Sequence, residues 1–344
     1  MKRIDFTCSS YNLKFNKPFD TSKGLITEKN GFLIHLKSDT GKSAVGDAVP
    51  FPEFGTETFA AAEKELKTLK LNIRINLKDI ESSILESLTP LGNFPALHHG
   101  FEQALINLVS KENNISINEI LNESSKKNIN INAVIGLLSL EETLKEADKF
   151  IKDGYSTLKL KAGRDKFEDD FNCIKAVREF AGDKINLRID ANGKWRLNDA
   201  IEHLNVLKPL NLEYVEQPVN SIVHFIKLKS GTSVPIAVDE SIRNMKDAVD
   251  FIQKKAADVL VLKPMMLGGI IPVLIIKNLA DEHRIKVVIT SSFESVVGRS
   301  MAVFAASTVK GNSAHGLATG SYFVKDLFPD PYPVKKGIIS LESK

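Results

Sequence analysis

The chain has 344 residues, of which 43% are hydrophobic and 26% are charged, and this composition excludes a disordered or low-complexity protein. The 46 Lys and Arg residues only slightly outnumber the 43 Asp and Glu residues, and no long basic run gathers the net charge of +3. Nucleic acid is therefore not an expected partner. At the usual ~100–200 residues per domain, a chain of this length is predicted to form two or three domains.

The two cysteines, Cys8 and Cys173, exclude a disulfide framework and a zinc site built from several cysteines. Residues 1–6 carry charge where a signal peptide needs an apolar core, and no stretch reaches the ~18 apolar residues of a membrane span. We therefore expect a cytoplasmic protein that acts without a membrane partner.

The first third of the chain predicts an α+β domain. Residues 32–37 and 42–48 have strand-like patterns and flank the turn-forming segment 38–41, which predicts a β-hairpin. Apolar residues at helical spacing predict helices at 57–71, 79–88 and 94–110. Segments 17–24 and 49–55 are rich in Pro, Gly and polar residues, and we expect them to be mobile loops that carry function.

From about residue 130 the pattern changes to βα alternation, because short strand-like runs are separated by longer amphipathic segments. The eight runs are 131–135, 157–161, 186–190, 212–216, 236–239, 259–263, 286–290 and 315–319. Eight strands with crossover helices in roughly 190 residues favour a (β/α) barrel over an open, doubly wound sheet. No Gly-x-Gly-x-x-Gly fingerprint follows any run, which weakens a dinucleotide-binding alternative.

Five consecutive runs of this series carry charged residues at their ends. These residues are Lys159 and Lys161, Asp190, Glu216, Asp239 and Lys263. The carboxyl ends of parallel barrel strands meet at one rim, where active sites lie, so we expect these side chains to be neighbours. A single charged strand end is as readily explained as the solvated start of a loop, but the whole set favours a functional cluster.

The three carboxylates of this set would repel one another strongly if they were gathered without partners. A divalent cation is the natural way to hold Asp190, Glu216 and Asp239 ionised. Hard oxygen ligands predict Mg²⁺, with Mn²⁺ as a possible substitute, and the lack of His or Cys beside these residues in the sequence argues against zinc.

Lys159 and Lys161 stand two positions apart on one strand and therefore share a face. A second ammonium group and a nearby metal ion both lower the pKa of a lysine below its usual ~10.4, so one of the two is predicted to act as a base near neutral pH. Such a site suits removal of a proton α to a carboxylate, because the metal and the ammonium groups stabilise the enediolate that results.

Five motifs, taken in order, resemble those of the enolase superfamily. They are LKLK at 158–161, LRIDAN at 187–192, YVEQP at 214–218, AVDES at 237–241 and LKP at 262–264. The resemblance implies an α/β fold with a (β/α)7β TIM-like barrel at 126–320 and an α+β capping domain at 1–125. It implies that the tail, 321–344, returns to the capping domain. It also implies that Asp190, Glu216 and Asp239 bind Mg²⁺.

The two-lysine pattern resembles the muconate-lactonising subgroup, and segments 291–298 and 315–320 are most similar to the o-succinylbenzoate synthase family. That likeness implies dehydration of a small-molecule carboxylate, 2-succinyl-6-hydroxy-2,4-cyclohexadiene-1-carboxylate, in menaquinone biosynthesis. By the same likeness Lys161 removes the α proton and assists departure of the hydroxyl group. Lys263 stabilises the enediolate, and Lys159 tunes Lys161.

The candidates for substrate binding are Arg188, Ser291 and Ser292. Arg188 faces inward on its strand, where its guanidinium could receive a carboxylate, although an ion pair in the barrel core explains it equally well. Ser291 and Ser292, with the Gly268-Gly269 turn and neighbouring backbone N–H groups, are candidates for holding the other carboxylate. Simple loop geometry explains these residues nearly as well.

An N-acylamino acid racemase or a dipeptide epimerase of the same superfamily remains an alternative function. Dipeptide epimerases typically carry Asp-x-Asp on the last strand to hold the substrate ammonium group, whereas residues 317–319 here are Leu-Ala-Thr. A buried ammonium group without a counter-charge is penalised, which disfavours a dipeptide. The synthase family often has Asp where this chain has Ala318. A further alternative is a non-catalytic binding protein on the same fold, and oligomeric state is not predicted.

Overall fold

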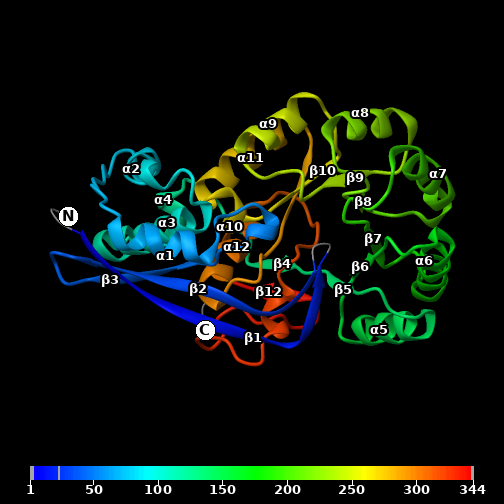
Figure 1. The fold of residues 1–344 in the computed structure, drawn as a ribbon, viewed down its shortest axis with the longest axis horizontal. Coiled ribbons are helices and arrows are strands. Elements are labelled where there is room, and N and C mark those ends of the chain that lie inside the picture. Colours follow the sequence, from blue (N-terminus) through cyan, green and yellow to red (C-terminus); the bar gives the residue numbers. More distant parts are fainter. Residues whose placement is uncertain (1–3, 22–23, 342–344) are drawn as a thin grey trace.

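The computed structural model describes residues 4–21 and 24–341 (Figure 1). The N-terminal part contains an antiparallel sheet in the order β1–β2–β3, formed by Ile4–Thr21, Gly24–Ser38 and Ser43–Ala48. The helices that follow are α1 (Phe59–Thr68), α2 (Ile80–Ser87), α3 (Pro95–Asn113) and the short α4 (Ile117–Ile120). The predicted hairpin is confirmed, because Phe32 of β2 pairs with Ala48 of β3.

Strand β1 was not predicted, although it pairs with β2 along most of its length. Residues 17–21 and Gly24, expected to belong to a loop, lie instead at the ends of β1 and β2. Most described side chains of β1 are exposed, and its buried ones are Leu13 and Phe15. Its apolar residues alternate in two short stretches, Ile4/Phe6 and Tyr11/Leu13/Phe15, but the apolar face changes between them, which interrupts the period of two. Segment 49–55 is a loop that contains a short 3₁₀ turn, Pro52–Phe54.

The three predicted helices are present, and local capping explains where they begin. The side chains of Thr58 and Asp79 accept backbone hydrogen bonds at the starts of α1 and α2, and Pro95 is the first residue of α3. Helix α3 lies so close to β3 that a Cβ atom at Gly46 would overlap the carbonyl oxygen of Gly100. Glycine at position 46 is thus what allows this helix to pack directly on the sheet.

The second sheet has seven parallel strands in the order β5 to β11, with chain neighbours adjacent in space. They are β5 (Ala133–Ile135), β6 (Thr157–Lys161), β7 (Asn186–Asp190), β8 (Tyr214–Glu216), β9 (Ile236–Val238), β10 (Val259–Leu262) and β11 (Lys286–Ile289). The helices of this part are α5 (Leu140–Lys152), α6 (Phe167–Ala181), α7 (Leu197–Leu207), α8 (Ile222–Gly231), α9 (Met245–Gln253), α10 (Pro264–Leu267), α11 (Ile270–Glu282) and α12 (Val296–Thr308). An α/β fold with a parallel sheet is therefore confirmed (Figure 1).

The eighth predicted run, 315–319, is not a regular strand. His315 and Gly316 make isolated parallel bridges with Ile131 and Thr290, which lie beside the two edge strands β5 and β11. Residues 318–322 then form a 3₁₀ helix. Glycine at positions 316 and 320 weakens a strand at this place, because glycine contributes no side chain to the sheet.

The C-terminal tail contacts both parts of the molecule. Val324 donates a backbone hydrogen bond to Lys14 of β1, and Phe323 makes an antiparallel bridge with Phe15. Farther along, β12 (Ile338–Ser340) pairs with β4 (Asn128–Asn130) in a separate two-stranded ribbon. The tail therefore runs from the N-terminal sheet to the segment that leads into β5.

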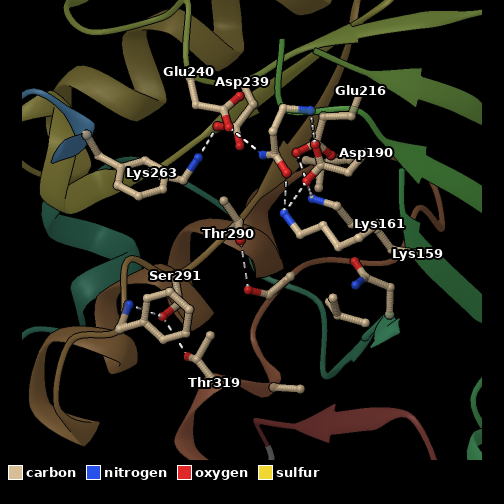
Figure 2. A pocket seen from close by; sticks show the side chains of 18 of the residues that line it. Lys159, Lys161, Asp190, Glu216, Asp239, Glu240, Lys263, Thr290, Ser291 and Thr319 are labelled. Carbon is tan, nitrogen blue, oxygen red and sulfur yellow. Dashed lines mark hydrogen bonds and ion pairs between the residues drawn. The ribbon is translucent and has the colours of Figure 1, made fainter. Parts of the chain in front are cut away.

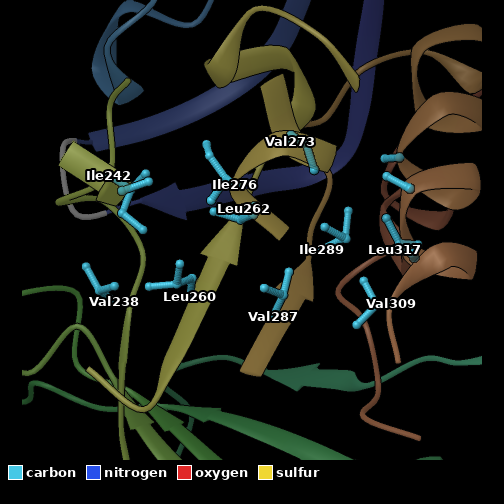
Figure 3. Close-up of a cluster of buried hydrophobic side chains, with 14 of the residues drawn as sticks. Val238, Ile242, Leu260, Leu262, Val273, Ile276, Val287, Ile289, Val309 and Leu317 are labelled. Carbon is cyan, nitrogen blue, oxygen red and sulfur yellow. The ribbon is translucent and has the colours of Figure 1, made fainter. Parts of the chain in front are cut away.

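Clusters of buried apolar side chains stabilise this fold and join its two parts. Val238, Leu260 and Ile276 are buried between the parallel sheet and its covering helices (Figure 3). A smaller buried cluster consists of Leu13, Phe15, Phe51, Phe293 and Phe323. This cluster holds β1 against the loops at the carboxyl ends of the parallel strands. Within the described residues, no helix combines the length and the apolar character needed to cross a membrane.

Candidate active site

The charged strand ends line one cavity of about 120 Å³ (Figure 2). The six predicted residues in its wall are Lys159, Lys161, Asp190, Glu216, Asp239 and Lys263. They are brought together by register, because Lys161 of β6 pairs with Asp190 of β7, which pairs with Glu216 of β8. The expectation that these side chains become neighbours is therefore confirmed.

Each of the three predicted carboxylates of this cavity has a lysine partner. The Nζ atom of Lys159 lies 2.6 Å from Glu216 Oε1 and 2.9 Å from Asp190 Oδ2, so one ammonium group is shared by two carboxylates. Lys161 Nζ lies 2.8 Å from the same Asp190 oxygen, and Lys263 forms an ion pair with Asp239. These carboxylates are almost fully buried, which makes the pairing with lysine essential in this state.

Burial and charge act in opposite directions on the buried members of this network. Burial alone would raise the pKa of Asp190, but Lys159 and Lys161 hold it well below its usual range. Burial raises the pKa of Glu216 to about 8; the charge of Lys159 opposes this rise, and the negative charges of Asp190 and Asp239 add to it. Burial lowers the pKa of Lys159, yet Asp190 and Glu216 together raise it well above its usual value. The site thus keeps Lys159 charged.

Lys161 is held by a second partner that the sequence reasoning missed. Its Nζ atom donates to Asn192 Oδ1 at 2.8 Å, and Asn192 Nδ2 donates to Glu240 Oε1 at 2.6 Å. Asn192 adopts φ 45°, a left-handed conformation that asparagine tolerates better than most residues. Glu240 Oε2 is buried without a hydrogen-bond partner in the described structure. Asn192 is two positions after Asp190 in the DAN motif and Glu240 follows Asp239 in the DES motif, and this proximity is the signal that could have found them.

The carboxylates offer hard oxygen donors on three successive strands, the donor type that Mg²⁺ prefers. Asp190 and Glu216 both contact the ammonium group of Lys159, so their oxygens lie close enough together to contact one cation. Asp239 is turned to Lys263 instead. Across residues 4–21 and 24–341, no group of three His, Cys, Asp or Glu side chains is gathered closely enough to hold a metal ion as it stands.

Arg188 is absent from the described wall of the cavity, so the structure does not place its guanidinium where it was expected to receive a substrate carboxylate. Its side chain is fully buried, and it donates from Nε and Nη2 to both carboxylate oxygens of Glu213, at 2.8 and 3.0 Å. Nη1 donates to the backbone oxygen of Ala314 at 2.8 Å. Arg188 and Asp190 point to the same face of β7, but Arg188 stands two residues nearer the start of the strand. At that depth its neighbour is Glu213, the residue just before β8. The alternative of an ion pair in the core is the one observed.

The Gly268-Gly269 turn is also not available to a substrate. The backbone N–H groups of Ile270 and Ile271, at the start of α11, donate to the carboxylate of Glu102 at 2.5 and 3.2 Å. A Cβ atom at Gly269 would overlap that carboxylate. The positive end of helix α11 is therefore satisfied by an acidic side chain of α3 rather than by a ligand.

Of the two serines, Ser291 lines the cavity, whereas Ser292 is absent from its described wall. Ser291 Oγ donates to Glu294 Oε2 at 2.9 Å and lies 2.6 Å from Thr319 Oγ1. The backbone N–H of Ser292 donates to the same Glu294 oxygen. The Ser291 hydroxyl and the Ser292 backbone N–H are thus engaged by a carboxylate of the protein, whereas Ser292 Oγ is buried without a hydrogen-bond partner in the described structure. Figure 2 shows Ser291 and Thr319 apart from the acidic cluster, on the other side of the pocket.

The N-terminal part supplies one wall of the cavity. Phe54, from the loop 49–55, lines the cavity, and its ring centroid lies 5.4 Å from Lys263 Nζ. Tyr322 of the tail lines it as well. This aromatic cover reduces access of water to the lysines and carboxylates, which strengthens the electrostatic interactions within the site.

Comparison with known proteins places these features in context. The sequence profile of the family described as "Enolase C-terminal domain-like" matches residues 142–344. The chain is 30% identical over 334 residues to D-Ala-D/L-Ala epimerase of Cytophaga hutchinsonii, covering 95% of this chain and 88% of that one. It is 27% identical over 350 residues to o-succinylbenzoate synthase of Bacillus subtilis, covering 100% of this chain and 92% of that one.

A solved structure with the same fold is the dipeptide epimerase of Cytophaga hutchinsonii complexed with Mg and the dipeptide D-Ala-L-Val. It superposes with a TM-score of 0.85 at 28% sequence identity, covering 97% of this chain and 92% of that one. Lyases and epimerases are thus both among the relatives, so the reaction has to be argued from the residues of the cavity.

Proposed function

The chain belongs to the family of enolase C-terminal domain-like proteins, and from this premise we propose that it is a Mg²⁺-dependent o-succinylbenzoate synthase. In this proposal the parallel sheet is a (β/α)7β barrel that residues 315–316 close, and the N-terminal part is its capping domain. The substrate is 2-succinyl-6-hydroxy-2,4-cyclohexadiene-1-carboxylate. Loss of water from its ring gives the aromatic product 2-succinylbenzoate.

Asp190, Glu216 and Asp239 are the residues that would hold Mg²⁺. When bound, the ion supplies positive charge that stabilises the enediolate form of the substrate carboxylate. The support is the chemistry of the donor set and the shared ammonium group of Lys159, which occupies a position that suits a cation. Binding of the substrate and the ion requires the ion pair between Lys263 and Asp239 to open.

In the proposed reaction Lys161 takes the α proton and then, as an ammonium group, donates a proton to the departing hydroxyl group. Its Nζ atom is oriented by Asp190 and Asn192, at 2.8 Å from each. Lys263 extends from the opposite side of the cavity and stabilises the developing negative charge (Figure 2). Lys159 stays protonated and favours the neutral form of Lys161 by repulsion, and its ammonium group gives up its place between Asp190 and Glu216 when the ion binds.

The observation that carries the choice of a lyase is the distribution of acidic side chains. The four carboxylates in the described wall belong to Asp190, Glu216, Asp239 and Glu240, on β7 and in the segments at the ends of β8 and β9. The opposite wall, from segments 288–293 and 316–322, contributes only neutral residues to that described wall. A dipeptide ammonium group would find no counter-charge there, and burying it unpaired is costly.

A second candidate function is racemisation of an N-acylamino acid. Lys161 and Lys263 approach the cavity from strands β6 and β10, with three strands between them, so they can address opposite faces of an α carbon. An N-acylated amino group carries no positive charge and therefore needs no carboxylate on the neutral wall.

The test is steady-state turnover of freshly prepared 2-succinyl-6-hydroxy-2,4-cyclohexadiene-1-carboxylate, followed by ultraviolet absorbance with Mg²⁺ and then with excess chelator. Aromatisation that stops on chelation supports the synthase. If the folded, Mg²⁺-loaded protein shows no turnover, the synthase assignment is wrong. Exchange of solvent deuterium into the α position of N-acylamino acids or dipeptides would then identify a racemase or an epimerase.

A further inference from the structure

The groups expected to hold the substrate carboxylates all contact acidic side chains of the protein instead. Glu213 pairs with Arg188, Glu102 accepts the N–H groups that follow the Gly268-Gly269 turn, and Glu294 engages Ser291 and Ser292. The proposed substrate carries two carboxylates, of which the catalytic cavity accounts for the one beside the reacting carbon. Cationic groups for the other must therefore lie elsewhere.

The size of the catalytic cavity leads to the same conclusion. Its volume of about 120 Å³ is below the ~300–1,000 Å³ typical of small-molecule sites. A much larger groove, of about 850 Å³, adjoins it. The two share four wall residues, Val134, Lys161, Asn192 and Tyr322, so the groove begins at the side chain of the proposed base.

Lysines from three separate elements converge on this groove. They are Lys17 of β1, Lys145 and Lys149 of α5, and Lys194 of the β7–α7 loop. The acidic residues in its described wall are Glu142 and Glu146, so basic groups are in excess even without Lys161.

The two acidic side chains are already engaged. Glu142 accepts hydrogen bonds from Ser139 at the start of α5, and Glu146 lies 3.9 Å from Lys149. Lys145 and Lys194 have no ion pair with any described residue, and Lys194 Nζ donates to the carbonyl oxygen of Gly163, directly beyond β6. These two lysines add positive charge at the groove, and Lys194 contacts Gly163, two residues after the proposed base Lys161.

We propose that this lysine-lined groove is a subsite for the distal carboxylate of an elongated dicarboxylate substrate, such as one with a succinyl tail. The inference rests on the proposed function, since it takes the reacting carboxylate to lie in the adjoining cavity. The lysines are exposed, so their contribution is electrostatic and is weakened by salt. The subsite selects substrates by the charge of the tail rather than by the reaction at the ring.

The test uses the Mg²⁺-loaded protein and the double variant Lys145→Glu/Lys194→Glu. The matched control is Lys152→Glu on the same helix, because Lys152 is exposed and does not line the groove. We expect the double variant to raise the KM for the dicarboxylate substrate about tenfold with kcat changed less than twofold, and the control to leave both unchanged. The neutral pair Lys145→Gln/Lys194→Gln should shift KM in the same direction by a smaller factor.

Equilibrium binding separates this inference from the proposed function. Calorimetric titration with 2-succinylbenzoate, and with 2-acetylbenzoate as a probe without the tail carboxylate, needs no turnover. The double variant should weaken the first ligand about tenfold and leave the second unchanged. If the wild-type protein turns nothing over but shows this selective loss, the subsite stands and the synthase assignment fails. If the double variant binds both ligands as the wild type does, the subsite is overturned.

Discussion

The side-chain amide of Asn192 joins Lys161 to Glu240 across the rim of the parallel sheet. Its oxygen accepts from Lys161 Nζ at 2.8 Å, and its nitrogen donates to Glu240 Oε1 at 2.6 Å, so the amide cannot rotate without losing both bonds. The backbone N–H of Asn192 also donates to Asp190 Oδ1 at 3.0 Å. Asn192 therefore holds Lys161 in place and is itself fixed by Asp190 and Glu240.

Asn192→Asp should lower kcat about tenfold and leave the fold intact. The new carboxylate faces Glu240 at hydrogen-bond distance, so repulsion displaces the group that orients Lys161, at a cost of about 1–3 kcal/mol. The measurement is kcat together with the pH profile of kcat.

The matched variant is Asn192→Asp/Glu240→Gln, in which the glutamine amide can donate to the new aspartate. We expect this double variant to recover most of the lost kcat. Equal activity of the single and double variants would show that Glu240 does not position Asn192.

Lys161→Ala should reduce turnover by about 10²–10⁴-fold, the usual contribution of a positioned acid or base. The side chain of Lys161 is 22% exposed and lies at the rim, so its removal leaves the apolar core unchanged. The checks are steady-state turnover and a thermal unfolding curve that matches the wild type. Activity near that of the wild type would mean that another group takes the proton.

The charged rim could be predicted from the sequence because strand geometry is local. Alternation with period two places Lys159 and Lys161 on one face, and parallel strands bring their ends together. Arg188 obeys the same alternation, but the pattern does not say at what depth a side chain lies. Whether it meets a ligand or Glu213 depends on the residue just before the next strand, 25 positions away.

Two other features could not be predicted because they depend on partners that are distant in the sequence. Strand β1 is mostly exposed, and its alternating apolar residues change face midway, so pairing with the edge of β2 is what makes it one continuous strand. The Gly268-Gly269 turn is filled by Glu102, which lies 168 positions before Ile270. The two glycines indicate that such a turn can bind an acidic group, but only the packing of α3 against α11 shows that Glu102 fills it.

Asp239→Asn should weaken Mg²⁺ binding at least tenfold and destabilise the metal-free protein by about 3 kcal/mol. The first effect follows from removing one negative charge from the proposed ligands, and the second from leaving the Lys263 ammonium group without its buried partner. The measurements are a calorimetric Mg²⁺ titration and urea unfolding. The control is Asp183→Asn, at an exposed position, and a Mg²⁺ titration identical to that of the wild type would remove Asp239 from the set of ligands.

Glu102 predicts a pH dependence of stability that is independent of the metal site. Burial raises the pKa of Glu102 to about 8, although Ile270 and Ile271 donate to its carboxylate. Because its folded pKa lies above the ~4.3 of an exposed glutamate, the folded state holds this proton more tightly. Its contribution to stability is complete below pH ~4.3 and is lost as the pH rises toward 8.

Glu102→Gln keeps an oxygen that can accept from the start of α11 but cannot ionise. The free energy of unfolding of this variant, relative to the wild type, should therefore rise by up to about 1.4 kcal/mol per pH unit between pH 5 and 8 and level off above. Urea unfolding at pH 5, 6.5, 8 and 9 measures this difference, and Glu86→Gln, at an exposed position, should show none. A difference that is constant across this range would mean that Glu102 is ionised throughout, held as an anion by the N-terminus of α11.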